Sequence, residues 1–242
     1  MGGMILARQR ADGGLMRAVG VDACRSGWVA IVLDDGQFTA AHIAASLEQI
    51  VAACPAAAVI GADMPLGLLQ RGWRQADELA AARLGAYRSR VFRMPPRAVW
   101  DATSHREAAG LCRQLTDPPA GFSVQAWGLK AKLRQAAELR ARLPHQLFEV
   151  HPELSFAAVN GGMPIAASKK TWNGQMTRRT LLADMGIHLP GDLAEAGTVQ
   201  ADDILDAAAA AWSASRIASG HAVSLPDPPQ LDEAGYPIAI WH

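Results

Sequence analysis

Three short apolar runs joined by tight turns restrict the fold of this chain more than any other feature. They cover residues 17–22, 28–34 and 37–43. An Arg-Ser-Gly turn follows the first run, and Asp-Asp-Gly, a hairpin signal, follows the second. Runs of this length and spacing predict an antiparallel meander of three strands.

A helix and a fourth apolar run complete this first segment. Ser46 can cap a helix over residues 47–54, and a β-rich run over residues 57–63 follows. A strand, a helix and a further strand form the parallel crossover unit. We therefore expect an α/β fold that begins β-β-β-α-β, with its first and fourth strands as parallel neighbours.

The rest of the chain adds helices to this sheet. Residues 64–144 are Ala- and Arg-rich and mostly helical in pattern, with helices expected over 74–86 and 124–142. A fifth strand is expected over 145–150, the strongest helix over 201–219, and an edge strand at the C-terminal end. We expect one domain over residues 17–242 with a helical insertion at 64–144, preceded by a disordered extension at 1–16.

Composition excludes several classes of function. Lys and Arg balance Asp and Glu, 23 against 23, so any nucleic-acid contact must come from a local basic patch. The three cysteines have no CxxC spacing, which is typical of reduced thiols in a cytoplasmic protein. No segment has the length of a membrane span, and the charged N-terminus does not match a signal peptide. We expect a cytoplasmic protein without a membrane partner.

Acidic residues follow two of the expected parallel strands. Asp22 ends the first strand and Asp63 ends the fourth. Functional groups of open α/β sheets collect at the carboxyl ends of parallel strands, so these carboxylates are expected to be close together. Two unpaired carboxylates repel each other, and a divalent cation would remove that repulsion. Each could instead serve a local turn.

The last helix supplies further carboxylates. Asp203 and Asp206 are three residues apart and lie on one helix face, and the alanines at 207–211 allow close packing on a sheet. With Asp206 added, the set favours Mg²⁺ or Mn²⁺, which prefer carboxylate oxygens. Two such ions can stabilise the attacking and leaving oxygens of phosphodiester cleavage. Alternatively, Asp203 could only complement the helix dipole.

Six motifs in order resemble a known family, the DUF429 family of predicted RNase H-fold nucleases. They are GVDACRSGW, ADMPLGL, AARLGAYRSRVFRMPPR, FEVHPELSF, SKKTWNGQMTRR and DDILDAAAAAW. The resemblance implies an RNase H-like mixed sheet of three antiparallel and two parallel strands. It also implies metal-binding carboxylates on the first strand, the fourth strand and the last helix, which Asp22, Asp63 and Asp206 match. The helical insertion departs from the compact RNase H pattern.

Further candidates lie around this acidic set. Glu149 and His151 alternate along an expected strand, so Glu149 could be an additional catalytic ligand and His151 a proton shuttle. A strand-end hydrogen-bond network would explain the same pattern. Seven tryptophans are numerous for this length. Core packing is the default for each, and base stacking would require an exposed ring.

Basic residues in two groups are candidates for binding a substrate phosphate. They are Arg83, Arg90 and Arg93, with Arg88 and Arg97 nearby, in the insertion, and Lys169 and Lys170, with Arg178 and Arg179, further along the chain. Arginines paired with Asp77 and Glu78 on a solvated helix face are the alternative. The sequence therefore favours a metal-dependent phosphodiesterase acting on nucleic acid or a nucleotide-like substrate. The competing hypothesis is a non-catalytic RNase H-fold scaffold whose carboxylates are neutralised by arginines of the insertion; either could form a homodimer through Ala-rich helices.

Overall fold

The computed structural model describes residues 15–242, which form two compact units. The sheet unit comprises residues 15–63, 145–223 and 241–242, and the helical unit comprises 64–144 and 224–240. The predicted insertion bounds coincide with the first segment of the helical unit. The predicted N-terminal extension falls mainly on residues 1–14, which lie outside the described residues.

The sheet unit begins with the expected meander. Strands β1 (Arg17–Cys24), β2 (Gly27–Asp34) and β3 (Gln37–Ala44) pair antiparallel in sequence order. Helix α1 (Leu47–Ala53) follows, with Ser46 accepting the backbone N–H of Gln49 in a capping box.

Two parallel strands extend this meander. Strand β4 (Val59–Ala62) pairs parallel to β1, and β5 (Leu147–Glu149) pairs parallel to β4. The resulting order, β3-β2-β1-β4-β5, contains three antiparallel and two parallel strands. The α/β architecture predicted from the sequence is confirmed.

Helix α8 (Ala201–Ala218) packs directly on the backbone of the sheet. A Cβ atom at Gly20 of β1 would lie 1.9 Å from the Ala211 nitrogen and 2.1 Å from the Ala207 oxygen. Gly61, opposite Gly20 on β4, faces the Ala210 oxygen in the same way. Glycines on the strands and alanines on the helix together permit this short separation.

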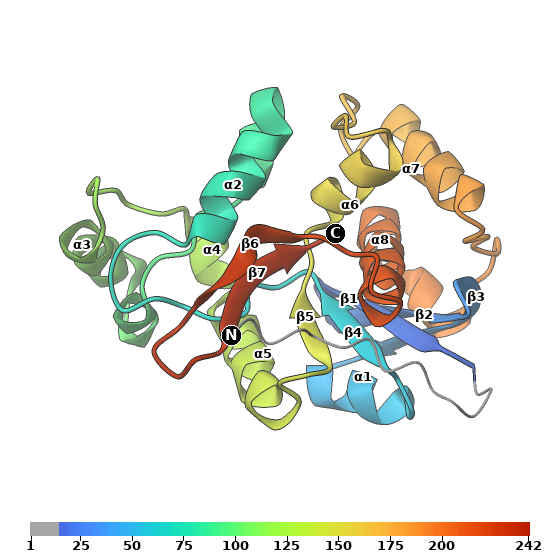
Figure 1. Cartoon of the computed structure of the whole chain (residues 1–242), viewed down its shortest axis with the longest axis horizontal. Helices are drawn as coiled ribbons and strands as arrows, with labels where there is room; N and C mark the ends of the chain where they lie inside the picture. The colour runs from blue at the N-terminus through green and yellow to red at the C-terminus, as the bar shows by residue number, and fades with distance from the viewer. Residues whose placement is uncertain (1–14) are drawn as a thin grey trace. The chain divides into compact units, whose positions relative to one another are not determined.

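Other helices complete the layers of the sheet unit. Helices α6 (Pro152–Val159) and α7 (Trp172–Asp184) pack on α8, and a 3₁₀ helix, η3 (Ala194–Thr198), leads into α8. Helix α1 lies on the other side of the sheet from α8 (Figure 1). The sheet unit thus has three layers, with α8 as the helix closest to the strands.

The helical unit contains short helices and a hairpin. Its elements are α2 (Gln75–Leu84), η1 (Gly85–Arg90), η2 (Arg97–Asp101), α3 (His105–Leu115), α4 (Val124–Gly128), α5 (Lys130–Arg142), β6 (Ser224–Leu231) and β7 (Pro237–Trp241). The single helix predicted over 124–142 is wrong: the Leu129 N–H bonds the Ala126 oxygen at 3.0 Å, a tight turn after which α5 begins. The C-terminal residues pair with β6 in a separate two-stranded sheet, and Trp241 makes only an isolated bridge, to Val150.

Among residues 15–242, no helix is both long and apolar enough to cross a membrane.

Candidate metal centre

Three carboxylates from three elements meet at one end of the sheet. Val21 of β1 pairs with Ala62 of β4, so Asp22 and Asp63 leave the sheet side by side. Asp206 lies in α8, beside the segment that packs on Gly20. One oxygen of each carboxylate lies within 4.8 Å of the others. The structure therefore brings together the three residues that the sequence placed in a metal site.

Burial makes the charges of these carboxylates unfavourable. Asp22 and Asp206 are buried, and Asp63 is half-buried. Burial raises the pKa of Asp22 well above its usual range, and Asp63 and Asp206 add to that rise. Burial likewise raises the pKa values of Asp63 and Asp206 to about 6, although Lys169 lowers both. A bound cation would therefore stabilise the ionised form of these carboxylates.

The donor atoms fit a hard divalent cation. Asp206 Oδ1 is buried and has no hydrogen-bond partner, whereas Asp22 Oδ1 accepts the Ala23 N–H at 2.7 Å. A buried carboxylate oxygen without a partner is costly, and metal coordination is one way to satisfy it. Oxygen ligands from several carboxylates are the set that Mg²⁺ and Mn²⁺ prefer. The cluster could therefore hold a metal ion.

A lysine already reaches this cluster. The Lys169 ammonium forms an ion pair with Asp206 and lies 3.9 Å from Asp202 Oδ2. Burial opposes its charge, but Asp206, Asp63 and Asp22 outweigh that effect and raise the Lys169 pKa. Lys169, predicted as a substrate ligand, is thus the counter-ion of the carboxylates in this structure.

A second ion pair lies beside the first. Lys170 Nζ is 2.6 Å from Asp202 Oδ2, and Asp202 is buried although Lys170 is exposed. Asp202 was not predicted from the sequence as part of the site, although its spacing of four residues from Asp206 puts both side chains on one face of α8. Asp203, half-buried, has its pKa raised by burial and by Asp202. It lies next to the group of three but outside it.

Glu149 occupies a different position from the one expected for a ligand. It pairs with Ala62 rather than with Asp63, so its side chain leaves the sheet on the face opposite Asp22 and Asp63. The side chain is buried there. His151, the expected proton shuttle, precedes the first turn of α6 as its N-cap residue. The strand register therefore does not support Glu149 as a metal ligand.

A buried ion pair, which the sequence did not reveal, holds the lysine segment in place. Arg178 of α7 is fully buried and pairs with Glu153 of α6. The same guanidinium donates to the Ala167 and Gly174 oxygens, each at 3.1 Å. Since Ala167 is two residues from Lys169, this arginine fixes the chain that delivers the lysine. The sequence signalled Arg178 only through the SKKTWNGQMTRR motif and as a member of the second basic group, a candidate for phosphate binding rather than for a buried ion pair.

The candidate arginines of the helical unit are partly explained by structural pairing. Arg93 lies 2.9 Å from Glu78 and 4.1 Å from the centre of the Trp73 ring, and Arg90 lies 4.3 Å from the centre of the Tyr87 ring. Arg83 is exposed in the last turn of α2. Arg93 thus makes an ion pair with Glu78, as the alternative described, although Arg93 lies in the loop after η1 rather than on a helix face.

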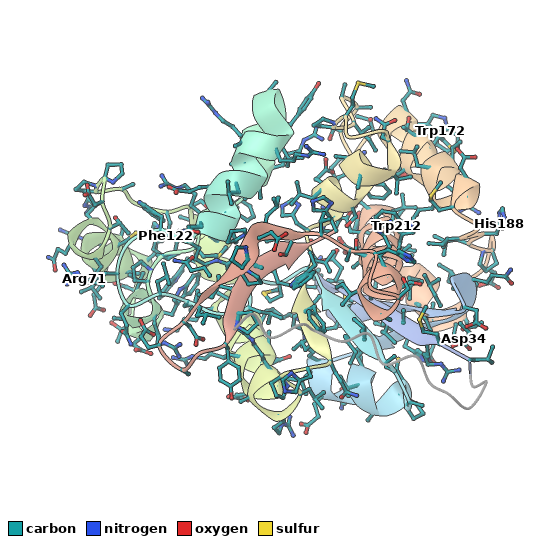
Figure 2. All side chains as sticks on the ribbon, viewed as in Figure 1. Asp34, Arg71, Phe122, Trp172, His188 and Trp212 are labelled. Carbon is teal, nitrogen blue, oxygen red and sulfur yellow. The ribbon has the colours of Figure 1, made fainter. Side chains whose placement is uncertain are left out.

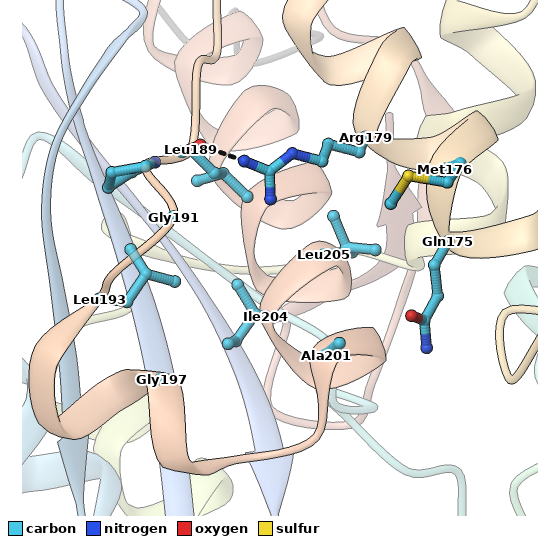
Figure 3. Close-up of a pocket in the computed structure, with 11 residues that line it drawn as sticks. Gln175, Met176, Arg179, Leu189, Gly191, Leu193, Gly197, Ala201, Ile204 and Leu205 are labelled. Carbon is cyan, nitrogen blue, oxygen red and sulfur yellow. Dashed lines mark hydrogen bonds between the residues drawn. The ribbon is translucent and has the colours of Figure 1, made fainter. Parts of the chain in front are cut away.

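A small pocket lies on another face of α8. It has a volume of about 170 Å³, with Ile204 and Leu205 of α8 among its lining residues. Arg179 extends across it and donates to the Leu189 oxygen at 2.6 Å (Figure 3). Successive helix residues point about 100° apart, so Leu205 lines this pocket while Asp206 faces the carboxylates. The pocket and the candidate metal centre are separate features of one helix.

Comparison with protein families decides the affiliation of the chain. The model of a family described as "Protein of unknown function (DUF429)" matches residues 20–231. The chain belongs to the DUF429 family. Neither the curated proteins nor the solved structures contain a match to it. The resemblance drawn from the six motifs is confirmed, and the function of this DUF429 protein must be argued from its site.

Proposed function

We propose that this DUF429 protein is a divalent-metal-dependent phosphodiesterase that hydrolyses nucleic acid or a nucleotide-like substrate. The observation that carries the proposal is the group of three carboxylates within 4.8 Å, one oxygen of which is buried without a partner. Asp22, Asp63 and Asp206 would hold Mg²⁺ or Mn²⁺. When bound, the metal would supply an activated water and charge stabilisation at phosphorus.

The residues of the chain have distinct tasks in this proposal. The three carboxylates would fix the position of the cation, and the two buried ones, Asp22 and Asp206, would exclude bulk water from one side of it. Lys169 is charged, flexible and 36% exposed in its side chain, so it can turn from Asp206 towards a phosphate oxygen. Arg178 and Glu153 keep the lysine segment in place. Asp203, half-buried beside the cluster, is suited to hold or release a proton near the reacting atoms.

One experiment tests the metal site directly. Mn²⁺ binding is measured by isothermal titration calorimetry for the wild type and for Asp22→Asn, Asp63→Asn and Asp206→Asn. Loss of a neighbouring second-sphere group typically costs 10- to 100-fold in metal affinity, so losing a ligand is expected to cost about 100-fold. Asp184→Asn, an exposed residue at the end of α7, is the matched control. Hydrolysis of single-stranded and duplex oligonucleotides is then followed in the same variants.

A second candidate function rests on the Lys169–Asp206 ion pair. A lysine that neutralises the carboxylates permanently would leave an RNase H-like scaffold without catalysis. The scaffold hypothesis expected arginines of the insertion to neutralise the carboxylates. In this version, Lys169 of the sheet unit would neutralise them instead. Wild-type protein that binds no Mn²⁺ at millimolar concentration would favour this scaffold and overturn the phosphodiesterase.

A further inference from the structure

Trp172 is the exposed tryptophan of this chain. All seven tryptophans lie within the described residues, and Trp172 alone is exposed, with 73% of its surface accessible. Its side chain projects from the first turn of α7 (Figure 2). Core packing therefore does not account for this indole, and its exposed ring can contact a ligand.

The backbone that carries Trp172 is firmly anchored. Thr171 caps α7 by accepting the Gly174 N–H at 3.2 Å, and its own N–H bonds the Ser168 oxygen at 3.0 Å. Gly174 permits this packing, because a Cβ atom there would lie 1.9 Å from the Ser168 oxygen. The indole is therefore exposed on a fixed support, which limits the entropy lost when a ligand stacks on it.

Trp172 lies close to the candidate metal centre along the chain. Lys169, three residues earlier, contacts Asp206 through its ammonium group. Three residues span at most about 11 Å. Successive stacked nucleotides are about 3.4 Å apart, so this backbone span corresponds to about three nucleotides, to which the length of the Lys169 side chain is added. A base on the indole would belong to the strand whose phosphodiester reaches the carboxylates.

Local charge explains why stacking would be useful here. Six carboxylates act at the centre, since Glu153 also raises the pKa values of Asp63 and Asp206. Three cations oppose them: Lys169, Lys170 and Arg178, the partner of Glu153. The acidic surplus repels phosphates unless metal is bound, so the lysines alone cannot supply strong affinity. Stacking of a base on an aromatic ring is electrically neutral, tolerates any sequence and requires an unpaired base.

We infer that Trp172 is a stacking platform for an unpaired nucleobase, which makes single-stranded nucleic acid the substrate class of the centre. The inference rests on the proposed function, because the stacked base positions the strand for cleavage. A duplex would not offer a free base face to the indole. The exposed ring is thus assigned a ligand of defined chemistry beside the carboxylates.

Binding of fluorescein-labelled single-stranded oligonucleotides to the full-length protein tests the inference. Anisotropy is measured in Ca²⁺, a divalent ion that also takes oxygen ligands, for the wild type, Trp172→Ala and Trp172→Phe. Met185→Ala, which truncates an exposed side chain at the other end of α7, is the control. Each protein is also titrated with an abasic strand of equal length.

The expected result is a loss specific to the base. Trp172→Ala should weaken binding of the base-containing strand about tenfold, the range found when a stacking ring is removed. Trp172→Phe should retain most of the affinity, and all four proteins should bind the abasic strand alike. Equal affinity of Trp172→Ala and wild type for the base-containing strand would overturn the inference, and would point instead to a protein partner for the indole.

The two proposals fail separately. Base-dependent binding through Trp172 with no Mn²⁺ bound at the carboxylates would refute the phosphodiesterase and keep the stacking platform. Mn²⁺-dependent hydrolysis that is identical in Trp172→Ala would keep the enzyme and refute the platform.

Discussion

The Lys169 side chain decides how the carboxylates behave without metal. Its ammonium lies against Asp206, and Asp63 and Asp22 also stabilise its charge. A metal ion and this ammonium are like charges that favour the same oxygens. Two unit charges 4 Å apart interact by about 4 kcal/mol at the effective dielectric constant of a protein surface. In the proposed phosphodiesterase, Lys169 would therefore compete with metal for the cluster and could turn towards a substrate phosphate.

Lys169→Met separates these two effects. Removing the ammonium should tighten Mn²⁺ binding about tenfold, because the competing charge is gone. Phosphodiester hydrolysis should nevertheless fall, because the phosphate loses a cationic partner. Calorimetry and steady-state kinetics on one preparation measure both quantities, and Lys170→Met, which leaves Asp206 paired, is the control. If Lys169→Met binds Mn²⁺ more weakly, the ammonium and the metal do not compete.

Two ion pairs of the sheet unit differ in how far their cations are exposed. Arg178 and Glu153 are both buried and serve the packing of α6 and α7. Lys169 and Asp206 combine a half-exposed cation with a buried anion, so the Lys169 ammonium can move away from Asp206 into solvent. Breaking a buried pair from one side costs several kcal/mol, so Arg178→Met should destabilise the protein rather than alter its chemistry alone.

At the scale of elements, the contact of α8 with β1 positions the site. Gly20 lies two residues before Asp22 on the same face of β1, and Ala207 directly follows Asp206 on α8. The separation of helix and strand therefore fixes the separation of the two carboxylates. Any side chain between them would move one ligand away from the other.

Gly20→Ala tests this coupling. The added Cβ would lie 1.9 Å from the Ala211 nitrogen, so α8 must shift, and overpacking of this kind costs about 3 kcal/mol or more. Urea denaturation should show that loss, and Mn²⁺ affinity should fall with it. Gly191→Ala, where a Cβ meets open space, should change neither. Unaltered Mn²⁺ affinity in a folded Gly20→Ala protein would show that the helix does not set the site.

At the scale of the whole molecule, the carboxylates link stability to pH. The pKa values of Asp63 and Asp206 in the folded protein are about 6, above the ordinary value, and that of Asp22 is raised too. The folded state then binds protons more tightly than the unfolded state. Such groups contribute stability that is fully present below the unfolded pKa, about 4, and is lost as pH rises through the folded value. Lys169 stays charged throughout this range.

The metal-free protein should therefore lose stability between about pH 4 and pH 7, by a few kcal/mol. Thermal unfolding in EDTA at several pH values measures this loss. Saturating Mn²⁺ should restore stability at neutral pH, since a ligand that binds only the folded state stabilises it. Asp206→Asn removes one titrating group and should flatten the profile. A metal-free protein whose stability rises steadily from pH 4 to pH 7 would contradict the raised pKa values.

Local patterns in the sequence were sufficient for strands β1 to β4, for a fifth strand and for the three carboxylates. The complete mixed sheet was implied by the family resemblance, and β6 (Ser224–Leu231) was not predicted because its segment is rich in proline. The runs ending in Asp22 and Asp63, the Ser46 cap and the Ala-rich helix each reflect short-range physics: hydrophobic period, turn chemistry and capping. Parallel pairing of β1 and β4 follows from the crossover, and it places the two aspartates together. The break at Leu129 was missed because a helical period persists across it.

Tertiary structure alone decided which charges meet. Three ion pairs form because distant segments of the chain fold back next to α8. They are Lys169 with Asp206, Lys170 with Asp202, and Arg178 with Glu153. Strand register turned Glu149 away from Asp63, and packing left Trp172 exposed while the other tryptophans became buried or partly buried. Sequence periodicity sets which face of an element a residue occupies. Only the packed fold determines what lies opposite that face, because burial and long-range contacts arise from elements distant in the chain.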